Sequence, residues 1–251
     1  MATGLGDAVG IERGVQISRK EVRRIDQADA SPAIEPRRRS YAATRAVNLI
    51  LSTVALVVAS PVLVLCAILV KLTSPGPIFY TQTRVGIDRR RTPVWPAGYD
   101  RRASNVGGLP FIIYKFRSMY VDAERGTGAV WASLDDPRVT PIGRIMRKCR
   151  IDELPQLINV IGGDMNLVGP RPERPLIFSQ LSRDIAEYPL RQRAKPGITG
   201  LAQINHTYDT CLDDVRAKVR YDLEYLERQG VKEDLRIMAR TVPVVIFGRG
   251  W

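Results

Sequence analysis

Apolar positions are unevenly distributed along this chain, and the longest apolar stretch covers residues 46–70. The stretch contains no charged residue and is bounded by Arg45 and Lys71. As one continuous helix it would be about 37 Å long at about 1.5 Å per residue, enough to cross a bilayer core of about 30 Å. Pro61 removes a backbone donor and clashes with the turn before it. We therefore expect a sharp kink there, with Ser60 able to cap the freed backbone groups.

Basic residues flank this segment on both sides. Arg37, Arg38, Arg39 and Arg45 precede it, and Lys71, Arg84 and Arg89 to Arg91 follow it. A spanning helix normally has a positive charge bias on one side only. Equal flanks favour a helix that enters one leaflet, turns at Ser60-Pro61 and returns to the same face. We therefore expect a re-entrant membrane helix over residues 41–73, and a true span or a buried core helix remain the alternatives.

The remaining pattern predicts shorter elements. Residues 78–85 and 111–117 are rich in β-branched and aromatic side chains and predict two strands. Residues 88–110, between them, form a loop rich in Pro, Gly and Arg. Apolar residues at helical spacing then predict helices over residues 139–149, 155–161, 175–188, 213–229 and 232–247. The expected fold class is mostly α with a minor β-hairpin.

Both ends of the chain are basic. Residues 1–40 mix Gly, Ala, Asp and Arg and predict a flexible leader, because the apolar run starts too late for a signal peptide. The last helix places Arg236 and Arg240 among aliphatic residues. A basic amphipathic helix of this kind can lie in the membrane interface, and an ordinary core-facing helix fits the same pattern.

Composition narrows the classes of function. The formal net charge is +12 and the pI is near 10.0, which suits nucleic acid, an anionic membrane surface or a phosphorylated substrate. Three widely separated cysteines argue against a disulfide framework or a structural zinc site. His206 is the single histidine, so a His-based triad or metal cluster would depend on that one residue.

Asp152 and Glu153 lie side by side in the densest run of charged and turn-forming residues. Arg138 and Arg147 precede them and Arg171 follows. Adjacent carboxylates beside guanidinium groups can hold a divalent metal and a polyphosphate together, and one carboxylate can attack phosphorus. Taken alone, Asp152 would fit the N-cap of a helix that begins near Pro155 and ends at Gly162-Gly163. The surrounding arginines favour a phosphate site at that helix N-terminus.

Other cations add to the candidate phosphate site. Pro170 and Pro172 fix the backbone on both sides of Arg171, which suits bidentate binding of phosphate, although a plain polar turn has the same composition. Lys115 and Arg117 stand at the end of a predicted strand, and Lys195 precedes a Pro-Gly turn.

At this point the chain resembles the bacterial sugar transferase family, the monotopic phosphoglycosyl transferases that begin glycan assembly on polyprenyl phosphate. The matching motifs occur in family order from about residue 41 to the C-terminus. They are Ala59-Ser60-Pro61-Val62, Gly76-Pro77-Ile78-Phe79, Thr81-Gln82-Thr83-Arg84-Val85-Gly86, Tyr114-Lys115-Phe116-Arg117-Ser118-Met119, Asp136-Pro137-Arg138-Val139-Thr140, Asp152-Glu153-Leu154-Pro155-Gln156-Leu157, Gly163-Asp164-Met165, Leu167-Val168-Gly169-Pro170-Arg171-Pro172, Lys195-Pro196-Gly197-Ile198-Thr199-Gly200 and Tyr221-Asp222-Leu223-Glu224-Tyr225. The loop from 88 to 109 is longer than the family pattern, and Leu201 replaces a frequent tryptophan.

The resemblance implies a mechanism. Asp152 would attack the β-phosphate of a nucleoside-diphosphate sugar, a UDP-sugar in most of the family, and release the nucleoside monophosphate. Polyprenyl (undecaprenyl) phosphate would then attack the phosphosugar held on Asp152. Mg²⁺, or Mn²⁺, would bind at Asp152 and Glu153. Arg171, Arg147, Arg138, Lys115, Arg117 and Lys195 would bind phosphate.

The resemblance also implies an organisation. Residues 1–40 form the leader, 41–73 the re-entrant helix broken at Ser60-Pro61, and 74–251 a compact cytosolic catalytic domain seated on the membrane with interfacial amphipathic helices. By this resemblance the chain would be a small, minimal member of the family, on the cytoplasmic face of the bacterial inner (plasma) membrane. Its partners would be membrane lipid, polyprenyl phosphate and a nucleotide sugar, in the first membrane step of surface glycan or exopolysaccharide synthesis. The sequence does not indicate the oligomeric state, and a homo-oligomer is one of the options.

Two other functions fit part of the sequence. A nucleic-acid-binding protein would explain the charge, but it would need a basic face interleaved with aromatic residues and a known binding module, and neither is present. We therefore expect no nucleic-acid partner. A membrane-anchored glycosyltransferase of another type would transfer the sugar without its phosphate. The released nucleotide distinguishes this enzyme from a phosphoglycosyl transferase, because it would be a nucleoside diphosphate and not a monophosphate.

Overall fold

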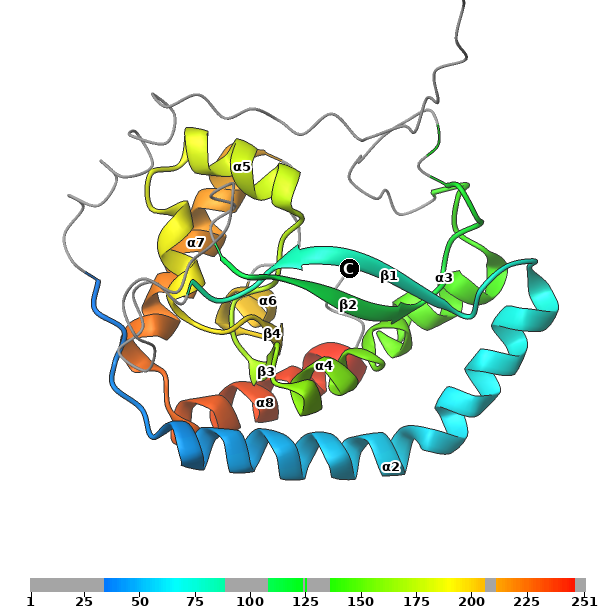
Figure 1. Ribbon diagram of the computed structural model, residues 1–251, viewed down its shortest axis with the longest axis horizontal. Coiled ribbons are helices and arrows are strands. Elements are labelled where there is room, and N and C mark those ends of the chain that lie inside the picture. Colours follow the sequence, from blue (N-terminus) through cyan, green and yellow to red (C-terminus); the bar gives the residue numbers. More distant parts are fainter. Residues whose placement is uncertain (1–33, 89–107, 124, 126–135, 206–210, 247–251) are drawn as a thin grey trace, which may run out of the picture.

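The computed structural model describes residues 34–88, 108–123, 125, 136–205 and 211–246 (Figure 1). Most of the predicted leader and nearly all of the predicted 88–110 loop lie outside the described residues. The elements are α2 (Tyr41–Thr73), β1 (Phe79–Val85), β2 (Pro110–Phe116), α3 (Pro141–Lys148), the 3₁₀ turn η3 (Ile151–Glu153), α4 (Gln156–Gly162), β3 (Asn166–Val168), α5 (Pro175–Asp184), the 3₁₀ turn η4 (Tyr188–Arg193), β4 (Gly197–Thr199), α6 (Leu201–Asn205), α7 (Leu212–Arg228) and α8 (Val231–Ile246).

The long apolar segment forms one helix, α2, which is bent and not broken at Ser60-Pro61. The chain is helical on both sides of Pro61, and Figure 1 shows the C-terminal part of α2 turning away from the line of its N-terminal part. The Ser60 hydroxyl donates to the carbonyl of Val57 at 2.7 Å. The kink expected at Pro61 is thus present as a bend, but the helix is continuous and not broken there, since a proline removes only one backbone donor and the apolar turns around it can continue.

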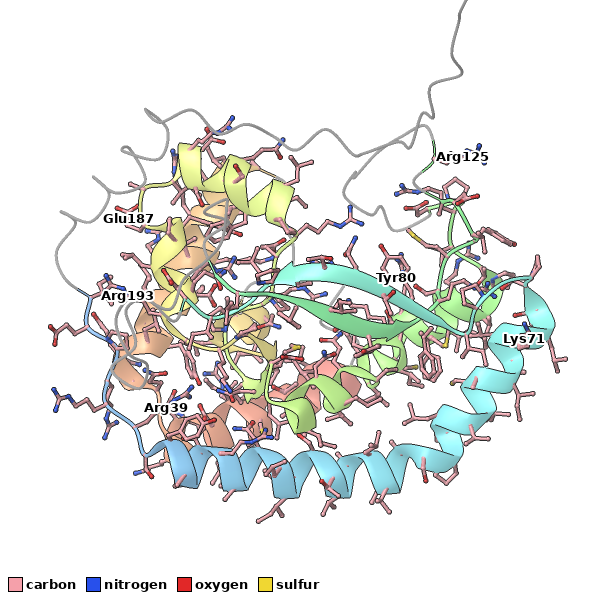
Figure 2. The ribbon with its side chains drawn as sticks, viewed as in Figure 1. Arg39, Lys71, Tyr80, Arg125, Glu187 and Arg193 are labelled. Carbon is pink, nitrogen blue, oxygen red and sulfur yellow. The ribbon has the colours of Figure 1, made fainter. Side chains whose placement is uncertain are left out.

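One side of α2 is apolar and exposed over most of its length. The helix is long and apolar enough to cross a membrane, with a mean hydropathy of 2.8 over its most apolar stretch, of which only 11% is buried. Figure 2 shows these side chains projecting outward, with no described element beyond them. The large exposed ones are Ile50, Val54, Val57, Val58, Val62, Val64, Leu65, Ile68 and Leu72. A buried core helix, the third alternative above, does not fit this exposure.

The opposite side of α2 docks on the rest of the protein through polar groups. Thr44, Asn48 and Ser52 are buried at helical spacing. Asn48 accepts a hydrogen bond from the backbone N–H of Leu167 at 2.6 Å, and Arg45 donates to two carbonyls in the last turn of α4. These bonds fix the apolar helix against α4 and β3.

The two predicted strands are confirmed as an antiparallel pair, β1 with β2. Phe79 lies opposite Phe116, and Val85 lies opposite Pro110. The rings of Phe79 and Phe116 stack with centroids 5.3 Å apart. Phe116 also packs in a buried cluster with Cys66 and Val70 of α2 and Met146 of α3. The hairpin therefore holds the C-terminal part of α2 to α3.

Arg117, directly after β2, closes the C-terminal end of α2. Its side chain is buried and donates to the carbonyl of Pro75 at 2.6 Å and to both the carbonyl and the hydroxyl of Ser74 at 2.8 Å. Gly76 makes room for it: a Cβ at that position would lie 2.0 Å from an Arg117 nitrogen, and φ there is +121°. The guanidinium thus satisfies two carbonyls directly after α2, and it also reaches the carbonyl of Val70 in the last turn of the helix at 3.4 Å.

We expect Arg117→Met to lower the free energy of unfolding by about 3 kcal/mol, because the carbonyls it serves would be left buried without donors. Thermal unfolding of the purified protein in detergent measures the loss. Arg228→Met is the matched control, since Arg228 forms an exposed i,i+4 ion pair with Glu224 and should matter by less than about 0.5 kcal/mol. An equal effect of both substitutions would contradict the capping role.

The five predicted helices are confirmed as α3, α4, α5, α7 and α8, with ends that differ by a few residues. Five elements were not predicted: the parallel strands β3 and β4, the short helix α6 and the 3₁₀ turns η3 and η4. Strands of three residues are too short to show a period of two. The largest core lies among α5, η4, α6, α7 and α8 and includes Phe178, Tyr188, Leu226 and Ile237. On α8, Ile237 faces that core whereas Leu235 and Val242 stay exposed, so this helix has a core-facing side and an exposed apolar side.

Candidate active site

Asp152 and Glu153 lie on a tight turn of the backbone between α3 and α4. Arg150 stands in the left-handed region at φ 57°, which is uncommon for a residue with a side chain, and η3 follows directly. Helix α4 begins only at Gln156, with Pro155 at its N-cap and Gly163 as a left-handed C-cap. The two carboxylates therefore sit on the 3₁₀ turn before α4, and Asp152 is not an N-cap of α4. The predicted helix end at Gly162-Gly163 is confirmed.

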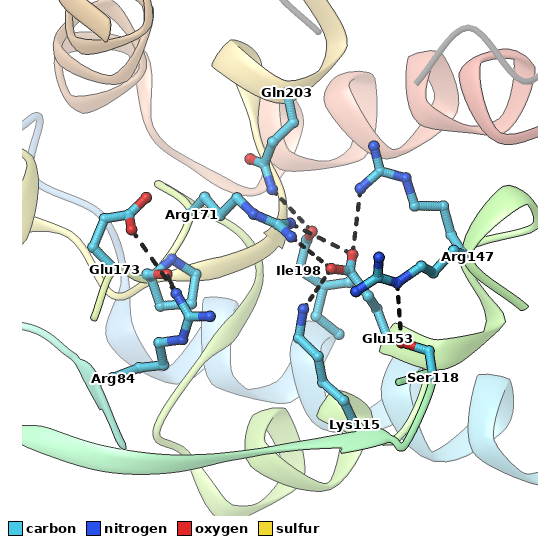
Figure 3. Close-up of polar contacts among 11 residues, drawn as sticks. Arg84, Lys115, Ser118, Arg147, Glu153, Arg171, Glu173, Ile198 and Gln203 are labelled. Atoms are coloured by element: carbon cyan, nitrogen blue, oxygen red, sulfur yellow. Dashed lines mark hydrogen bonds and ion pairs between the residues drawn. The ribbon is translucent and has the colours of Figure 1, made fainter. Parts of the chain in front are cut away.

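The Glu153 carboxylate forms ion pairs with three cations. Figure 3 shows two of them, Arg171 and Lys115. Arg171 approaches Oε1 at 2.6 Å, Lys115 approaches the same oxygen at 2.7 Å, and Arg150 lies 3.5 Å from Oε2. Although burial alone would raise it, the pKa of Glu153 lies well below its usual range, because Arg171 and Lys115 outweigh the cost of desolvation. Glu153 is thus a permanent anion that organises the cations around it.

Asp152, next in the chain, has the opposite environment. It is 8% exposed, and no side chain among the described residues donates a hydrogen bond to its carboxylate. Burial, with the Glu153 charge second, raises the pKa of Asp152, and the positive charges of Lys115, Arg147 and Arg171 oppose that rise. A carboxylate that is poorly solvated and not bonded to its neighbours keeps lone pairs for an incoming electrophile.

Arg147 and Arg138 lie on the side of the site formed by α3 and the segment before it. Arg147 donates from Nε to the hydroxyl of Ser118 at 3.0 Å, which orients its guanidinium, and its charge acts on Asp152. Arg138 forms a two-pronged pair with Asp136, at 2.8 and 2.6 Å. This pair lowers the pKa of Asp136 to about 2. Arg147 therefore belongs to the site, whereas Arg138 is already bonded to a carboxylate of its own.

Two predicted phosphate ligands do not meet the others. Arg117 is used to cap α2, as described above. Lys195 donates to the carbonyl of Gly163 at 2.6 Å and lies 5.6 Å from the centroid of the Tyr41 ring, so it bridges the end of α4 and the start of α2. Both were selected by residue type and motif position, and the tertiary structure directs both toward helix ends.

The structure adds residues that the sequence did not single out. Arg150 reaches Glu153, although nothing in its local sequence separates it from a surface arginine. Arg84, read before only as a basic flank of the apolar segment, donates to the carbonyl of Pro172 at 3.1 Å and lies 3.9 Å from Glu173 (Figure 3). Buried Arg191 donates to the carbonyl of Arg171 at 3.2 Å. Arg84 and Arg191 thus hold the backbone that presents Arg171.

The carboxylates offer a limited set of metal ligands. Among the described residues no group of three or more His, Cys, Asp or Glu side chains could hold an ion. Asp152 and Glu153 are the two acidic groups of the site, and both Glu153 oxygens already face cations. Mg²⁺ commonly binds through one or two carboxylates plus substrate phosphates and water. These residues therefore suit a metal ion that binds together with a diphosphate, with Asp152 as its protein ligand. They do not suit a site in which protein side chains supply all of the ligands.

Comparison with known proteins places this site in a family. The model of the bacterial sugar transferase family matches residues 39–248. A UDP-N-acetylgalactosamine-undecaprenyl-phosphate N-acetylgalactosaminephosphotransferase from Aeromonas hydrophila is 38% identical over 206 residues, covering 82% of this chain and 44% of that protein. A UDP-glucose:undecaprenyl-phosphate glucose-1-phosphate transferase from Escherichia coli (strain K12) is 41% identical over 201 residues, 79% of this chain and 39% of that protein.

A relative of similar length is the Exopolysaccharide production protein PSS of Rhizobium leguminosarum bv. phaseoli, 35% identical over 206 residues that cover 79% of this chain and 92% of that protein. The chain thus spans less than half the length of the first two relatives and most of the third. The match of the family model includes α2, the carboxylate pair and every cation that surrounds it. This chain belongs to the bacterial sugar transferase family.

Proposed function

We propose that the protein transfers a sugar 1-phosphate from a UDP-sugar to undecaprenyl phosphate. The single observation that carries the proposal is the division of roles in the carboxylate pair. Glu153 is neutralised by Lys115, Arg150 and Arg171, whereas Asp152 beside it is buried and unbonded to any described residue. This geometry suits a nucleophile next to a cationic cradle for phosphate. The names of the relatives support the two substrates.

In the first step a carboxylate oxygen of Asp152 attacks the β-phosphorus of the donor. The bond from that phosphorus to the bridging oxygen breaks, and the nucleoside monophosphate leaves with the electron pair. In the second step a phosphate oxygen of undecaprenyl phosphate attacks the same phosphorus and Asp152 is released as a carboxylate. Arg171, which bonds Glu153, and Arg147, whose charge acts on Asp152, would stabilise the negative charge that moves to the leaving oxygen.

The released nucleotide tests this proposal. Purified protein given a UDP-sugar and undecaprenyl phosphate should release UMP and form a lipid-linked diphosphate sugar. Release of UDP with a lipid monophosphate sugar would instead identify the other type of glycosyltransferase. A panel of UDP-sugars in the same assay identifies the sugar.

Divalent metal should be required for turnover. A Mg²⁺ ion at Asp152 would neutralise part of the diphosphate charge and stabilise the leaving phosphate. With oxygen ligands alone, the site should prefer Mg²⁺ or Mn²⁺ to Zn²⁺. EDTA should therefore abolish UMP release, and added Mg²⁺ should restore it, as followed by a coupled nucleotide assay. Full activity after exhaustive EDTA treatment and dialysis would contradict a metal-dependent step.

We further propose that α2 seats the remainder of the chain, residues 74–251, on the cytoplasmic face of the inner membrane. The bend at Pro61 and the basic flanks support a re-entrant arrangement, in which both ends of α2 face the cytosol. Single cysteines introduced at Ser40 and Thr73 should then both react with a membrane-impermeant label only after the cytoplasmic side is opened. Periplasmic labelling at position 40 would indicate a span.

Replacing Pro61 by leucine should favour that span, because it restores the missing backbone donor and straightens the helix. The label at position 40 should then become accessible from the periplasm, whereas the label at position 73 should not. Val62→Leu, next in the chain, is the matched control and should leave both labels cytoplasmic.

A further inference from the structure

The short segment that carries Arg171 is held at three consecutive backbone carbonyls, those of Pro170, Arg171 and Pro172. The donors are the N–H of Gly197 to Pro170 at 2.9 Å, Arg191 to Arg171 at 3.2 Å, and Arg84 to Pro172 at 3.1 Å. The two prolines restrict the backbone on both sides of Arg171 as well. The position of the Arg171 side chain therefore depends on groups outside the segment.

Arg191, which serves the carbonyl of Arg171 itself, is paired with Asp222 of α7. The same nitrogen, Nη2, that donates to the Arg171 carbonyl lies 2.7 Å from Oδ2 of Asp222. The other terminal nitrogen, Nη1, donates to the hydroxyl of Tyr188 at 2.6 Å. Arg191 is 5% exposed and Asp222 is 1% exposed. One buried guanidinium thus joins α7 and η4 to the segment that presents Arg171.

Stability alone is a poor reason for this buried ion pair. The desolvation of two charges offsets most of their attraction, and apolar residues of similar size in their place are often equally stable. In addition, Nε of Arg191 is buried with no hydrogen-bond partner among the described residues. The bond that Arg191 directs to the Arg171 carbonyl explains the pair better. Without Asp222, Arg191 would be an uncompensated buried charge, which favours its movement toward water and away from Arg171.

We propose that Asp222 and Arg191 are positioning residues of the transfer reaction, which hold Arg171 where its guanidinium meets the diphosphate of the donor. This inference rests on the proposed function. The contacts run from Asp222 through Arg191 to the Arg171 backbone, and the Arg171 side chain reaches Glu153 at 2.6 Å. A displacement of about 1 Å at a group that stabilises charge can lower a rate by about 10²-fold. Loss of a bond behind Arg171 should therefore slow the reaction.

A variant without either charge separates positioning from stability. Asp222→Leu combined with Arg191→Met puts two apolar side chains in place of the pair, so the melting temperature in detergent should stay close to that of the wild type. The kcat/KM for the UDP-sugar, followed by release of UMP, should nevertheless fall by about 10- to 100-fold, as is usual when a group that orients a ligating residue is removed. Asp213→Leu combined with Arg216→Met removes an exposed pair from the same helix and should change neither quantity.

Combination with Arg171→Lys tests whether the pair acts through Arg171. Lysine lacks the planar fork of the guanidinium, so its exact placement matters less. Adding the two substitutions to the Arg171→Lys protein should therefore lower kcat/KM by less than about threefold more. A further loss of the full 10- to 100-fold would place the action of the pair elsewhere and overturn the proposal. Should the charge-free protein fail to fold, Asp222→Asn, which keeps the shape and one acceptor oxygen, takes its place with the same expected pattern.

Binding of inorganic pyrophosphate with Mg²⁺ separates this proposal from the proposed function. By calorimetry, the charge-free variant should lose about tenfold or more in pyrophosphate affinity, as should Arg171→Lys. Wild-type protein that released no UMP would refute the transferase reaction, whereas this loss of pyrophosphate binding would still sustain the positioning role. Normal kcat/KM and normal pyrophosphate affinity in the charge-free variant would leave the reaction standing and refute the positioning role.

Discussion

Asp152→Asn should lower turnover by at least about 10³-fold, because an amide cannot form the acyl phosphate that links the two half-reactions. Within the described part of the chain no other carboxylate at the site is free to replace it, since Glu153 is held by Arg171, Lys115 and Arg150. Wild-type protein incubated with the UDP-sugar alone should release UMP in a burst and gain the mass of one phosphosugar. Intact-protein mass spectrometry and digestion would place that adduct on Asp152.

Two controls separate this chemistry from folding. Asp213→Asn changes an exposed carboxylate on α7 and should keep full activity. The Asp152→Asn protein should still bind UMP, because the change leaves the cations around Glu153 in place. An adduct on another residue, or normal turnover in the variant, would exclude Asp152 as the nucleophile.

The pH dependence of the wild type offers a further check on Asp152. Its folded pKa is raised by burial, and only the carboxylate attacks. The kcat/KM for the donor should therefore fall as the pH drops through that raised pKa, at a higher pH than an exposed aspartate would give. Because the folded pKa of Glu153 is depressed, the stability that Glu153 contributes should be fully present above the ordinary pKa of a glutamate. It should be lost progressively as the pH falls from there through the depressed folded pKa.

Arg171→Lys should lower kcat/KM for the UDP-sugar by about 10² to 10³-fold. This is the usual effect of losing one well-placed hydrogen-bond donor that stabilises charge in a transition state. Lysine keeps the charge but has no planar fork to bond Glu153 and a phosphate at once. The burst of UMP should slow in the same proportion, because the loss falls on the first half-reaction. Pre-steady-state release of UMP measures it.

Arg220→Lys, an exposed position on α7, is the matched control and should leave the burst unchanged. The melting temperature of the Arg171→Lys protein, taken together with its burst of UMP, tests whether Arg171 has only a structural role. A large fall in stability with a normal burst would mean that Arg171 only anchors Glu153. A slow burst in a stable protein supports phosphate binding.

The cations show where sequence reasoning reached its limit. Arg171 and Lys115 were selected beside Asp152 and Glu153, and the structure brings all four together. Arg117 and Lys195 were selected on equal grounds and lie at helix ends. Residue type and motif position could not separate these pairs, because an arginine bonds backbone carbonyls as well as it bonds phosphate.

The sequence by itself determined the elements and the chemistry that they carry. The uncharged, mostly apolar run of 25 residues from 46 to 70 predicted a long apolar helix. Enrichment in β-branched and aromatic residues predicted β1 and β2, and helical spacing predicted five helices. The adjacent carboxylates with arginines around them already specified phosphate chemistry.

The tertiary structure alone decided how those groups divide their roles. It bent α2 without interrupting it, since packing and neighbouring turns set whether a proline breaks a helix. It also neutralised Glu153 with cations from β2, the α3–η3 turn and the segment after β3, while Asp152 stayed unbonded among the described residues. Burial and charge at one carboxylate depend on groups 18 and 38 residues away in the chain, and no local pattern records such distances.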